Sequence, residues 1–218
     1  KEIEVLLPKS KEKGIGIQVN NLKSDNVIIN LITNQQSFNE VSQSSYELLI
    51  HKDGATKVIP VQFTTAQRRI AIPKKDLFKG INTVTLFDQN QNPILERMFF
   101  NDALVKKHSF SLEKVETDFD SIVYTLKADS NLPVDINASI SVLPRGTQSY
   151  NPKHNIASAF YLQPHLKGTI ENPSYYFTKV NRKKRYELDI LLMTQGWSRY
   201  SWEDIFYKTP EIVHPFQS

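Results

Sequence analysis

The chain of 218 residues contains 39% hydrophobic and 23% charged residues, which is the composition of a folded globular protein large enough for one large or two ordinary domains. Its 27 basic and 23 acidic residues leave a net charge of +4, too small an excess to indicate nucleic-acid binding. The absence of cysteine excludes disulfides, thiolate zinc sites and cysteine nucleophiles, and no apolar run approaches the roughly 20 residues that span a bilayer.

Short strands are predicted throughout the first hundred residues. Apolar residues alternate over residues 15–19 and form a more continuous run over residues 27–32. Two apolar runs flank Asp53 and Gly54, a pair that supplies the positive φ angles of a tight hairpin turn. A second hairpin is predicted where "NTVTLF" and "ILERMFF" flank a longer loop closed by Pro93.

A second set of strands is predicted after "NDALVKKH", in "FSLEKVE", "SIVYTLKA" and "VDINASISVL". Residues 134–142 alternate between apolar and polar side chains without a fault, so one face is expected to be buried and the other wet. Turn signals at close spacing, with no helices between the strands, are typical of antiparallel sandwiches. We therefore place a domain boundary near Ala103 and expect two domains, residues 1–103 and 104–218.

Helical patterns are confined to the C-terminal quarter. "IASAFYL" fits a short helix, and a longer helix is predicted from about Lys184 to Gln195, ended by Gly196. Ser201 is a suitable N-cap for one more short helix. The predicted fold class is mostly β, with two tandem antiparallel sandwiches, the second carrying a short helical C-terminal insert.

No constellation of catalytic or ligand-binding residues emerges from the sequence. The glycines at 14 and 16 lack the third glycine and following helix of a phosphate loop, and the five histidines are scattered singly. No serine lies in a nucleophile elbow, and the acidic residues occur singly in predicted turns or on wet strand faces. We predict a non-enzymatic protein without a cofactor or transition metal, although calcium binding by a loop such as "DQNQN" stays open.

Two features of the C-terminal region favour binding or packing. The first is a dense aromatic set: Phe160, Tyr161, Tyr175, Tyr176, Phe177, Tyr186, Trp197, Tyr200, Trp202, Phe206 and Tyr207. These rings either stack on a ligand or bury the helices on the sandwich. The second is the basic run Arg182, Lys183, Lys184 and Arg185, which is either a solvated loop or a contact for an acidic partner or lipid headgroup.

Three segments resemble a known family. "LFKGINTVTLFDQNQNPILERMFF" is similar to the closing strands of macroglobulin-type β-sandwich domains. "FYLQPHLKGTIENPSYYF" and "LDILLMTQGWSRYSW" resemble segments of large envelope proteins of Gram-negative bacteria. In that family these segments follow macroglobulin-type domains and precede a carboxypeptidase-regulatory-like sandwich and a TonB-dependent receptor plug domain. Members of the wider macroglobulin superfamily trap proteases through a Cys–Gln thioester, which a chain without cysteine cannot form.

The resemblance implies two tandem macroglobulin- or immunoglobulin-like domains and a location in the periplasm or at the outer membrane. It implies no catalytic residues. We expect a structural or protein-interaction module, cut from a longer polypeptide because the chain begins with Lys1 rather than Met, whose partners are other domains of the same polypeptide or other envelope proteins. The alternative is a glycan-binding module that uses exposed Trp197, Trp202, Tyr175 or Tyr176.

The candidate contact residues for a ligand or partner are therefore Tyr175, Tyr176, Trp202 and the basic run. Against this, the whole stretch from residue 171 to 202 is predicted to be a structural clasp that packs on the sandwich. In that interpretation Trp197 is buried after Gly196 ends the helix, and Trp197→Ala costs about 3–5 kcal/mol.

Overall fold

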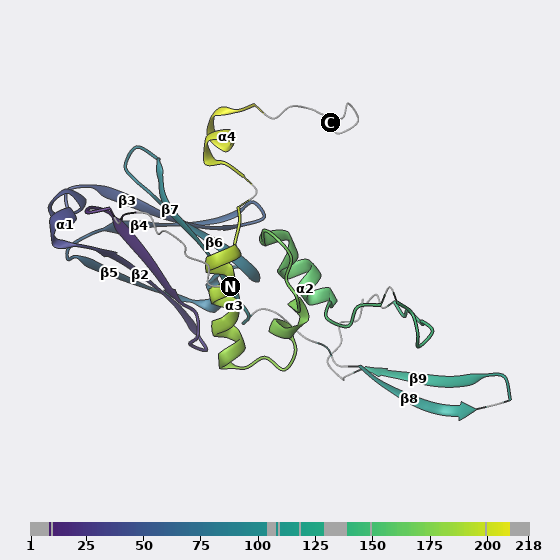
Figure 1. Cartoon of the computed structure of the whole chain (residues 1–218). Helices are drawn as coiled ribbons and strands as arrows, with labels where there is room; N and C mark the ends of the chain where they lie inside the picture. The colour runs from purple at the N-terminus through teal and green to yellow at the C-terminus, as the bar shows by residue number, and fades with distance from the viewer. Residues whose placement is uncertain are drawn as a thin grey trace, which may run out of the picture. The chain divides into compact units, whose positions relative to one another are not determined.

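The computed structural model describes residues 9, 11–103, 108, 110–117, 119–128, 139–148, 150–198 and 200–209. The fold is mostly β and antiparallel, as predicted, and the first hundred residues form a sandwich of two sheets (Figure 1). Sheet A has the order β1-β2-β5, and its strands are Ile15–Asn20, Asn26–Thr33 and Gln67–Pro73. Sheet B has the order β4-β3-β6-β7, and its strands are Ala55–Gln62, Ser45–Lys52, Gly80–Phe87 and Pro93–Asn101.

This strand order is that of an immunoglobulin-like sandwich in which the fourth strand pairs with the second sheet. The core lies between the two sheets and is built from alternate side chains of each strand. Its fully buried members include Val27, Ile29 and Leu31 of β2 and Leu48 and Ile50 of β3.

Both predicted hairpins are present. Asp53 and Gly54 have φ angles of 48° and 84°, so the turn between β3 and β4 uses the two left-handed residues that a tight hairpin requires. In the loop between β6 and β7 the carboxylate of Asp88 accepts hydrogen bonds from the backbone amides of Asn90 and Asn92 at 2.9 and 2.8 Å. That network, together with Pro93, ends the loop and starts β7.

Three elements of the sandwich had no clear sequence signal. Helix α1, Gln35–Val41, is only two turns long and is capped by Asn34, whose side chain accepts from the amide of Ser37. Strand β5 begins with three exposed polar residues, which hide the alternation that a half-buried strand normally shows. The 3-10 turn η1, Lys74–Asp76, follows β5 directly.

The chain divides into two compact units, Lys1–Leu104 together with Pro152–Ser218, and Val105–Asn151. This differs from the expected assignment, in which the C-terminal helices belong to the second domain. Those helices pack on the first sandwich instead, because they carry the apolar and charged partners of its outer face. In the second unit, β8 (Phe110–Thr117) and β9 (Ile122–Ala128) form an antiparallel hairpin. Of the strand predicted at 134–142, residues 134–138 lie outside the described residues. Residues 139–142 form no strand and are exposed, so the prediction of a half-buried strand is wrong for that part.

The C-terminal part of the first unit contains five short elements. They are α2 (Ile156–Tyr161), η2 (Gln163–His165), η3 (Pro173–Phe177), α3 (Arg182–Gln195) and α4 (Trp202–Tyr207). All three predicted helices are therefore present, although the side chain of Ser201 makes no capping hydrogen bond to α4. Asn181 caps α3 by accepting from the amide of Lys184 at 2.9 Å.

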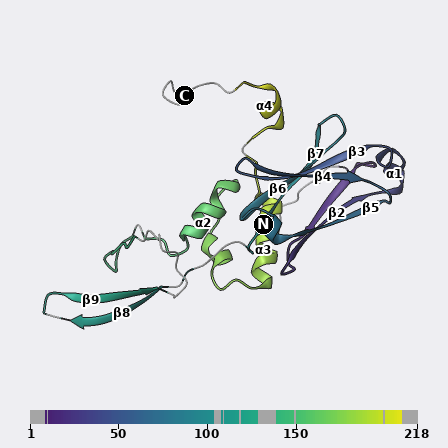
Figure 2. The ribbon, with the colours of Figure 1, turned by 180° about the vertical axis from the view of Figure 1, so that it is seen from behind.

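The segment that we call the clasp, residues 156–198 and 200–207, packs on β6 and β7 of sheet B and leaves the outer face of β4 exposed. Figure 2 shows α4 on the sheet B side of the sandwich. Phe100 of β7 packs against Tyr161 and Phe177, with ring centroids 5.9 and 5.6 Å away. Gly80 is needed beneath Tyr161, since a Cβ there would lie 2.8 Å from the ring and its φ is +85°. With a core on one side and the clasp on the other, every residue of β6 is buried.

Candidate binding site

Helix α3 is fixed to the sandwich by apolar contacts and ion pairs. Leu188 and Leu192 are 4% and 2% exposed. Asp102, just after β7, accepts from Lys74 Nζ at 3.0 Å and from Arg185 at 2.7 Å, and the Lys74 side chain is itself only 2% exposed. A second pair joins Arg97 of β7 to Asp189 of α3 at 2.6 Å. These contacts hold α3 along β7, where β1 approaches the same edge.

Burial governs the electrostatics of the Arg97–Asp189 pair. Desolvation raises the pKa of the Asp189 carboxyl, and the opposing attraction of Arg97 only partly offsets it. Arg97 also donates to the carbonyl of Val19 on β1 at 3.3 Å, so one guanidinium connects β1, β7 and α3. A buried ion pair of this kind fixes the position of a helix but adds little to the free energy of unfolding, because the cost of desolvating the two charges offsets most of their attraction.

After α3 the chain turns back in a segment that we call the strap, residues 196–198 and 200–202, the last of which begins α4. Its start pairs with the segment that follows η2: the amide of Trp197 donates to His165 O at 3.0 Å, and that of Lys167 donates to Gln195 O at 3.0 Å. Gly196 forms a bridge with Leu166 at this point. A Cβ at position 196 would lie 2.1 Å from the carbonyl oxygen of Leu192, so the close approach requires glycine.

Glu96 on β7 anchors the strap to sheet B. Its Oε2 accepts from Tyr200 Oη, Trp202 Nε1 and Thr85 Oγ1, each at 3.0 Å. Its Oε1 accepts from Ser198 Oγ. Three of these four donors belong to the strap, so a single carboxylate holds the segment across the sheet.

Aromatic edges complete the attachment at the far end of the strap. The Trp202 ring meets Phe87 and His51 edge-on, with centroids 5.0 and 5.4 Å away, and stacks with Phe206 at 5.6 Å. Such edge-to-face pairs add to the area that the rings bury. Trp202 therefore lies half-buried in a cluster made by sheet B and α4.

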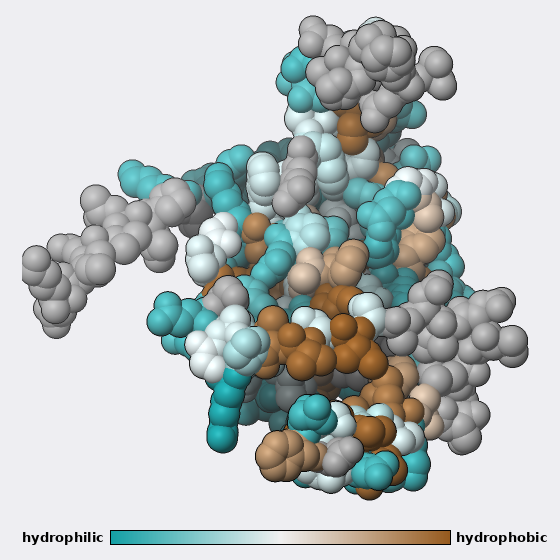
Figure 3. Space-filling model, turned by 90° about the vertical axis from the view of Figure 1, so that its right-hand side faces the viewer, coloured by the Kyte–Doolittle hydropathy of each residue, from teal (hydrophilic) through white to brown (hydrophobic). Residues whose placement is uncertain are grey.

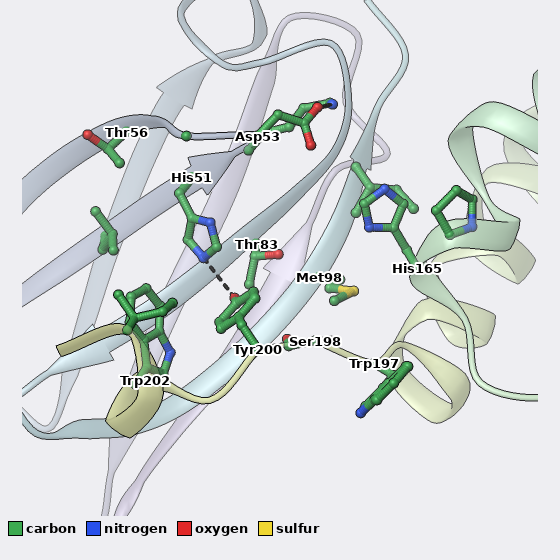
Figure 4. A pocket seen from close by; sticks show the side chains of 16 residues that line it. His51, Asp53, Thr56, Thr83, Met98, His165, Trp197, Ser198, Tyr200 and Trp202 are labelled. Carbon is green, nitrogen blue, oxygen red and sulfur yellow. Dashed lines mark hydrogen bonds and ion pairs between the residues drawn. The ribbon is translucent and has the colours of Figure 1, made fainter. Parts of the chain in front are cut away.

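His51 and Tyr200 form a hydrogen-bonded pair, 2.9 Å apart between Nε2 and Oη (Figure 4). Burial lowers the pKa of His51, and the negative charge of Glu96 only partly counteracts it. Burial also raises the pKa of Tyr200 to about 12. Because the single phenolic proton is donated to Glu96, a neutral His51 carries its proton on Nε2 and donates it to Tyr200 Oη.

Beside this anchor lies a pocket of about 520 Å³ between sheet B and the strap, which we call the strap pocket (Figure 4). Its base is formed by Leu49 of β3, Ile81 and Thr83 of β6 and Met98 of β7. Further lining residues come from the β3–β4 turn and the clasp: His51, Lys52, Asp53, Gly54, Thr56, Pro164, His165, Trp197, Ser198, Tyr200, Trp202 and Ile205.

Tyr175 and Tyr176, two predicted contact residues, lie elsewhere, against α3. Their rings are perpendicular, at 83°, and both are half-buried. Tyr175 Oη donates to Glu187 at 2.7 Å, and this hydrogen bond is the largest cause of its raised pKa. Desolvation raises the pKa of Tyr176. The two tyrosines therefore do not form a flat stacking platform.

The basic run is divided between structural contacts and solvent. Arg185 pairs with Asp102, Lys183 lies 3.7 Å from Glu187, and Lys184 lies 4.2 Å from the centre of the Tyr175 ring. Lys184 also donates to the carbonyl of Thr178 at 2.6 Å. Arg182, at the first turn of α3, is exposed. Most of this charge is engaged within the unit.

The prediction that Trp197 is buried is wrong, because its side chain is 45% exposed. The helix does end at Gly196, but the chain leaves it in an extended conformation that pairs with residues 165–167 and turns the ring toward the pocket rim. The Nζ of Lys167 lies 5.7 Å from the ring centre. Leu188 and Leu192 are buried as predicted, and Leu191 is partly buried.

Sequence reasoning missed two residues of the site, His51 and Glu96, and it named Tyr200 only as a member of the aromatic set. The sequence shows His51 only as one of five scattered histidines, and it predicts Glu96 in a turn or on a wet strand face. Glu96 is indeed exposed by area, yet its carboxylate has four donors. The available signal was that two apolar residues, Ile81 and Phe87, share one face of β6 with Thr83 and Thr85, which favours a partly covered outer face.

Within the described residues, no group of three or more His, Asp or Glu side chains is placed to hold a metal ion. No helix in that part of the chain has the length and apolar character needed to cross a membrane. Ser198 bonds to Glu96 and His51 bonds to Tyr200, so these four side chains do not form a serine–histidine nucleophile pair.

Comparisons with known proteins add little. No protein-family model and no curated protein matches the chain. Similar solved structures include a sensor domain of an anti-sigma factor from Pseudobacteroides cellulosolvens, at 14% identity and a TM-score of 0.32, with the match covering 44% of this chain and 100% of that one. A likeness at this level carries no argument about fold or function.

Proposed function

We propose that the chain is a non-enzymatic interaction module of a larger cell-envelope protein, facing the periplasm at the outer membrane. The envelope location is supported by the resemblance of the "LKGTIENPSYYF" and "TQGWSRYSW" segments. The non-enzymatic role is supported by the ionic and hydrogen-bonding groups around the clasp, which are engaged in positioning α3 and the strap rather than paired as nucleophile and base.

The observation that carries the interaction role is the outer side of α3. Tyr186, Ile190 and Met193 follow helical spacing and are 54%, 37% and 60% exposed, while Leu188 and Leu192 face the sandwich. A surface helix of a self-sufficient domain normally has one apolar side and one polar side. An additional exposed apolar row is typical of a protein contact.

Apolar side chains also reach the surface between hydrophilic ones on the face shown in Figure 3. The row on α3 differs from scattered exposed residues in two ways. Its members lie on one side of a single helix, and that helix is attached to the sandwich by ion pairs with Asp102 and Arg97. Because a preorganised surface loses little entropy on binding, α3 is suited to docking a neighbouring domain of the same polypeptide.

Photo-crosslinking in the full-length protein, expressed in its own cells, tests this proposal. A benzophenone amino acid at Met193 is expected to crosslink to a neighbouring domain of the same polypeptide, in the outer-membrane fraction. The same amino acid at Gln67, exposed on the edge strand β5, is the matched control and is expected to give no such product. Absence of an intramolecular crosslink from Met193, or recovery of the protein in the cytoplasm, would contradict the proposal.

The alternative, glycan binding by the aromatic residues first singled out, is not favoured at Tyr175 and Tyr176. A sugar stacks on the open face of a ring, and the perpendicular arrangement of these two rings offers no shared face. Trp202 stacks on Phe206, which covers one of its faces. Trp197, the remaining aromatic candidate, lines the strap pocket.

A further inference from the structure

We propose that the strap pocket binds a neutral saccharide. The inference goes beyond the interaction role proposed above, which would stand unchanged if no sugar bound. It rests on three features of the pocket: aromatic lining, compensated charge and size.

The lining combines apolar and polar groups in the way that a sugar ring requires. Trp197, Tyr200 and Trp202 contribute aromatic surface, while Leu49, Ile81 and Met98 make an apolar base. A pyranose has an apolar face of C–H groups that packs on such surfaces and a polar rim of hydroxyls. The polar groups at the turn between β3 and β4, Lys52, Asp53 and Thr56, lie where those hydroxyls would find donors and acceptors.

The charges in the pocket favour a ligand without net charge. Lys52 and Asp53 form an ion pair with each other. His51 is held by Tyr200 and has a pKa below its ordinary value, so the ring is neutral near pH 7. The carboxylate of Glu96, which lies beside the pocket and does not line it, accepts hydrogen bonds from the strap. A phosphate or carboxylate ligand would find no uncompensated cation among these groups, whereas neutral hydroxyls need none.

The volume of about 520 Å³ lies within the range of roughly 300–1,000 Å³ that is usual for small-molecule sites. A mono- or disaccharide fits this space. The pocket is also preorganised, since the strap is held at both ends, by pairing at residues 196 and 197 and by Glu96 at Ser198, Tyr200 and Trp202.

The chain offers a built-in reporter for this site. It contains two tryptophans, and both line the strap pocket. Their two indole N–H signals in a nitrogen–proton correlation spectrum therefore report on the pocket itself. We expect titration of the intact chain with cellobiose and with maltose to shift at least one indole signal saturably, with a dissociation constant near or below about 1 mM for the preferred linkage.

Variants test whether the sugar that shifts the indole signals binds in the strap pocket. Thr56→Phe, an exposed position at the pocket rim, is expected to weaken binding at least about tenfold by narrowing the entrance. Tyr175→Ala, outside the pocket, is the matched control and should leave the titration unchanged. Glucuronic acid, an anionic monosaccharide, tests the charge argument and should shift the indole signals less than glucose.

Three results would overturn the proposal. One is the absence of a saturable indole shift with either disaccharide in the unmodified chain, which does not depend on any variant folding. Another is loss of the shift in Tyr175→Ala but not in Thr56→Phe, which would place binding elsewhere. The third is a saturable shift with N-acetyl-leucinamide and none with sugars, which would make the pocket a site for an apolar peptide side chain.

Discussion

Helix α3 and the strap are adjacent in sequence and lie on the same sheet, yet they are attached by different interactions. Helix α3 buries two leucines almost completely and shares ion pairs with Asp102 and Arg97. The strap contributes partly exposed rings and hydrogen bonds to Glu96, itself exposed. The first attachment depends on apolar burial, and the second depends on polar contacts that water can replace.

The difference predicts different stabilities for the two regions. Removing apolar area from water is worth roughly 25 cal/mol per Å², whereas an exposed hydrogen bond contributes only about 1 kcal/mol. The strap is therefore expected to open locally with a lower free energy than α3, without unfolding of the sandwich.

The largest effect is expected where α3 is most buried. Leu192→Ala should lower the free energy of unfolding by about 2–5 kcal/mol, because it removes buried methyl groups and leaves a cavity against β7. Met193→Ala, one residue further and 60% exposed, is the control and should change stability by less than about 0.5 kcal/mol. Urea denaturation followed by circular dichroism measures both, and equal effects would erase the distinction between the two sides of α3.

Much of the first sandwich was predictable, because its strands alternate and its turns carry local signals. The Asp53–Gly54 pair marks the β3–β4 hairpin from sequence alone, since few other residues adopt two consecutive positive φ angles. Strand β5 and helix α1 were missed because short elements take their stability from packing rather than from propensity.

The candidate site was less predictable, because it is made by long-range contacts. Glu96 and Trp202 are 106 positions apart, and nothing in the sequence near Glu96 indicates its donors. The sequence predicts a buried Trp197 because an aromatic residue after a helix stop can fold under the helix. The pairing of Gly196 with Leu166 sends the chain outward instead.

Gly196→Ala should weaken the junction between the two regions. Its Cβ would collide with the carbonyl of Leu192, so the last turn of α3 or the pairing with Leu166 must shift, at an expected cost of about 1–3 kcal/mol. At Gly16 the nearest atom to an added Cβ is 3.8 Å away, so Gly16→Ala is a suitable control. Comparing their urea midpoints tests whether glycine is required at position 196 for space.

Trp197→Ala is expected to cost about 1–2 kcal/mol, below the 3–5 kcal/mol of a buried aromatic residue, because nearly half of the ring is already exposed. Thermal unfolding monitored by circular dichroism measures this loss. A decrease as large as that of Leu192→Ala would mean that the ring is buried in solution and that the strap resembles α3 after all.

Glu96→Gln should loosen the strap while leaving the sandwich intact. The hydrogen bonds from Ser198, Tyr200 and Trp202 lose their charge assistance, which in this exposed setting is worth about 1 kcal/mol or less. In a Trp197→Phe background the fluorescence comes from Trp202, and its emission should move to longer wavelength. Glu47→Gln, exposed on β3 and separated from β7 by β6, is the control, and an equal shift there would mean that Glu96 has no special role.

The smallest effect is a pH dependence centred on the strap. His51 has a pKa below its ordinary value of 6.5 in the folded chain, because burial disfavours the charged ring more than Glu96 favours it. As the pH falls through about 6.5, the unfolded chain therefore binds a proton before the folded chain does. The stability associated with His51 is thus fully present above that pH and is lost as the pH falls toward the lowered folded pKa.

His51→Gln should abolish the part of the pH dependence of stability that comes from His51. The difference in urea midpoint between the variant and the parent should therefore change between about pH 7.5 and pH 5.5. Glu96→Gln should make the loss of stability at low pH larger, because the negative charge of Glu96 raises the pKa of His51 and its removal lowers that pKa further. His154→Gln, an exposed histidine outside the strap pocket, serves as the control for histidine content. If His51→Gln and the parent keep a constant difference across this range, His51 is solvated like any surface histidine, and the strap does not shield it from water.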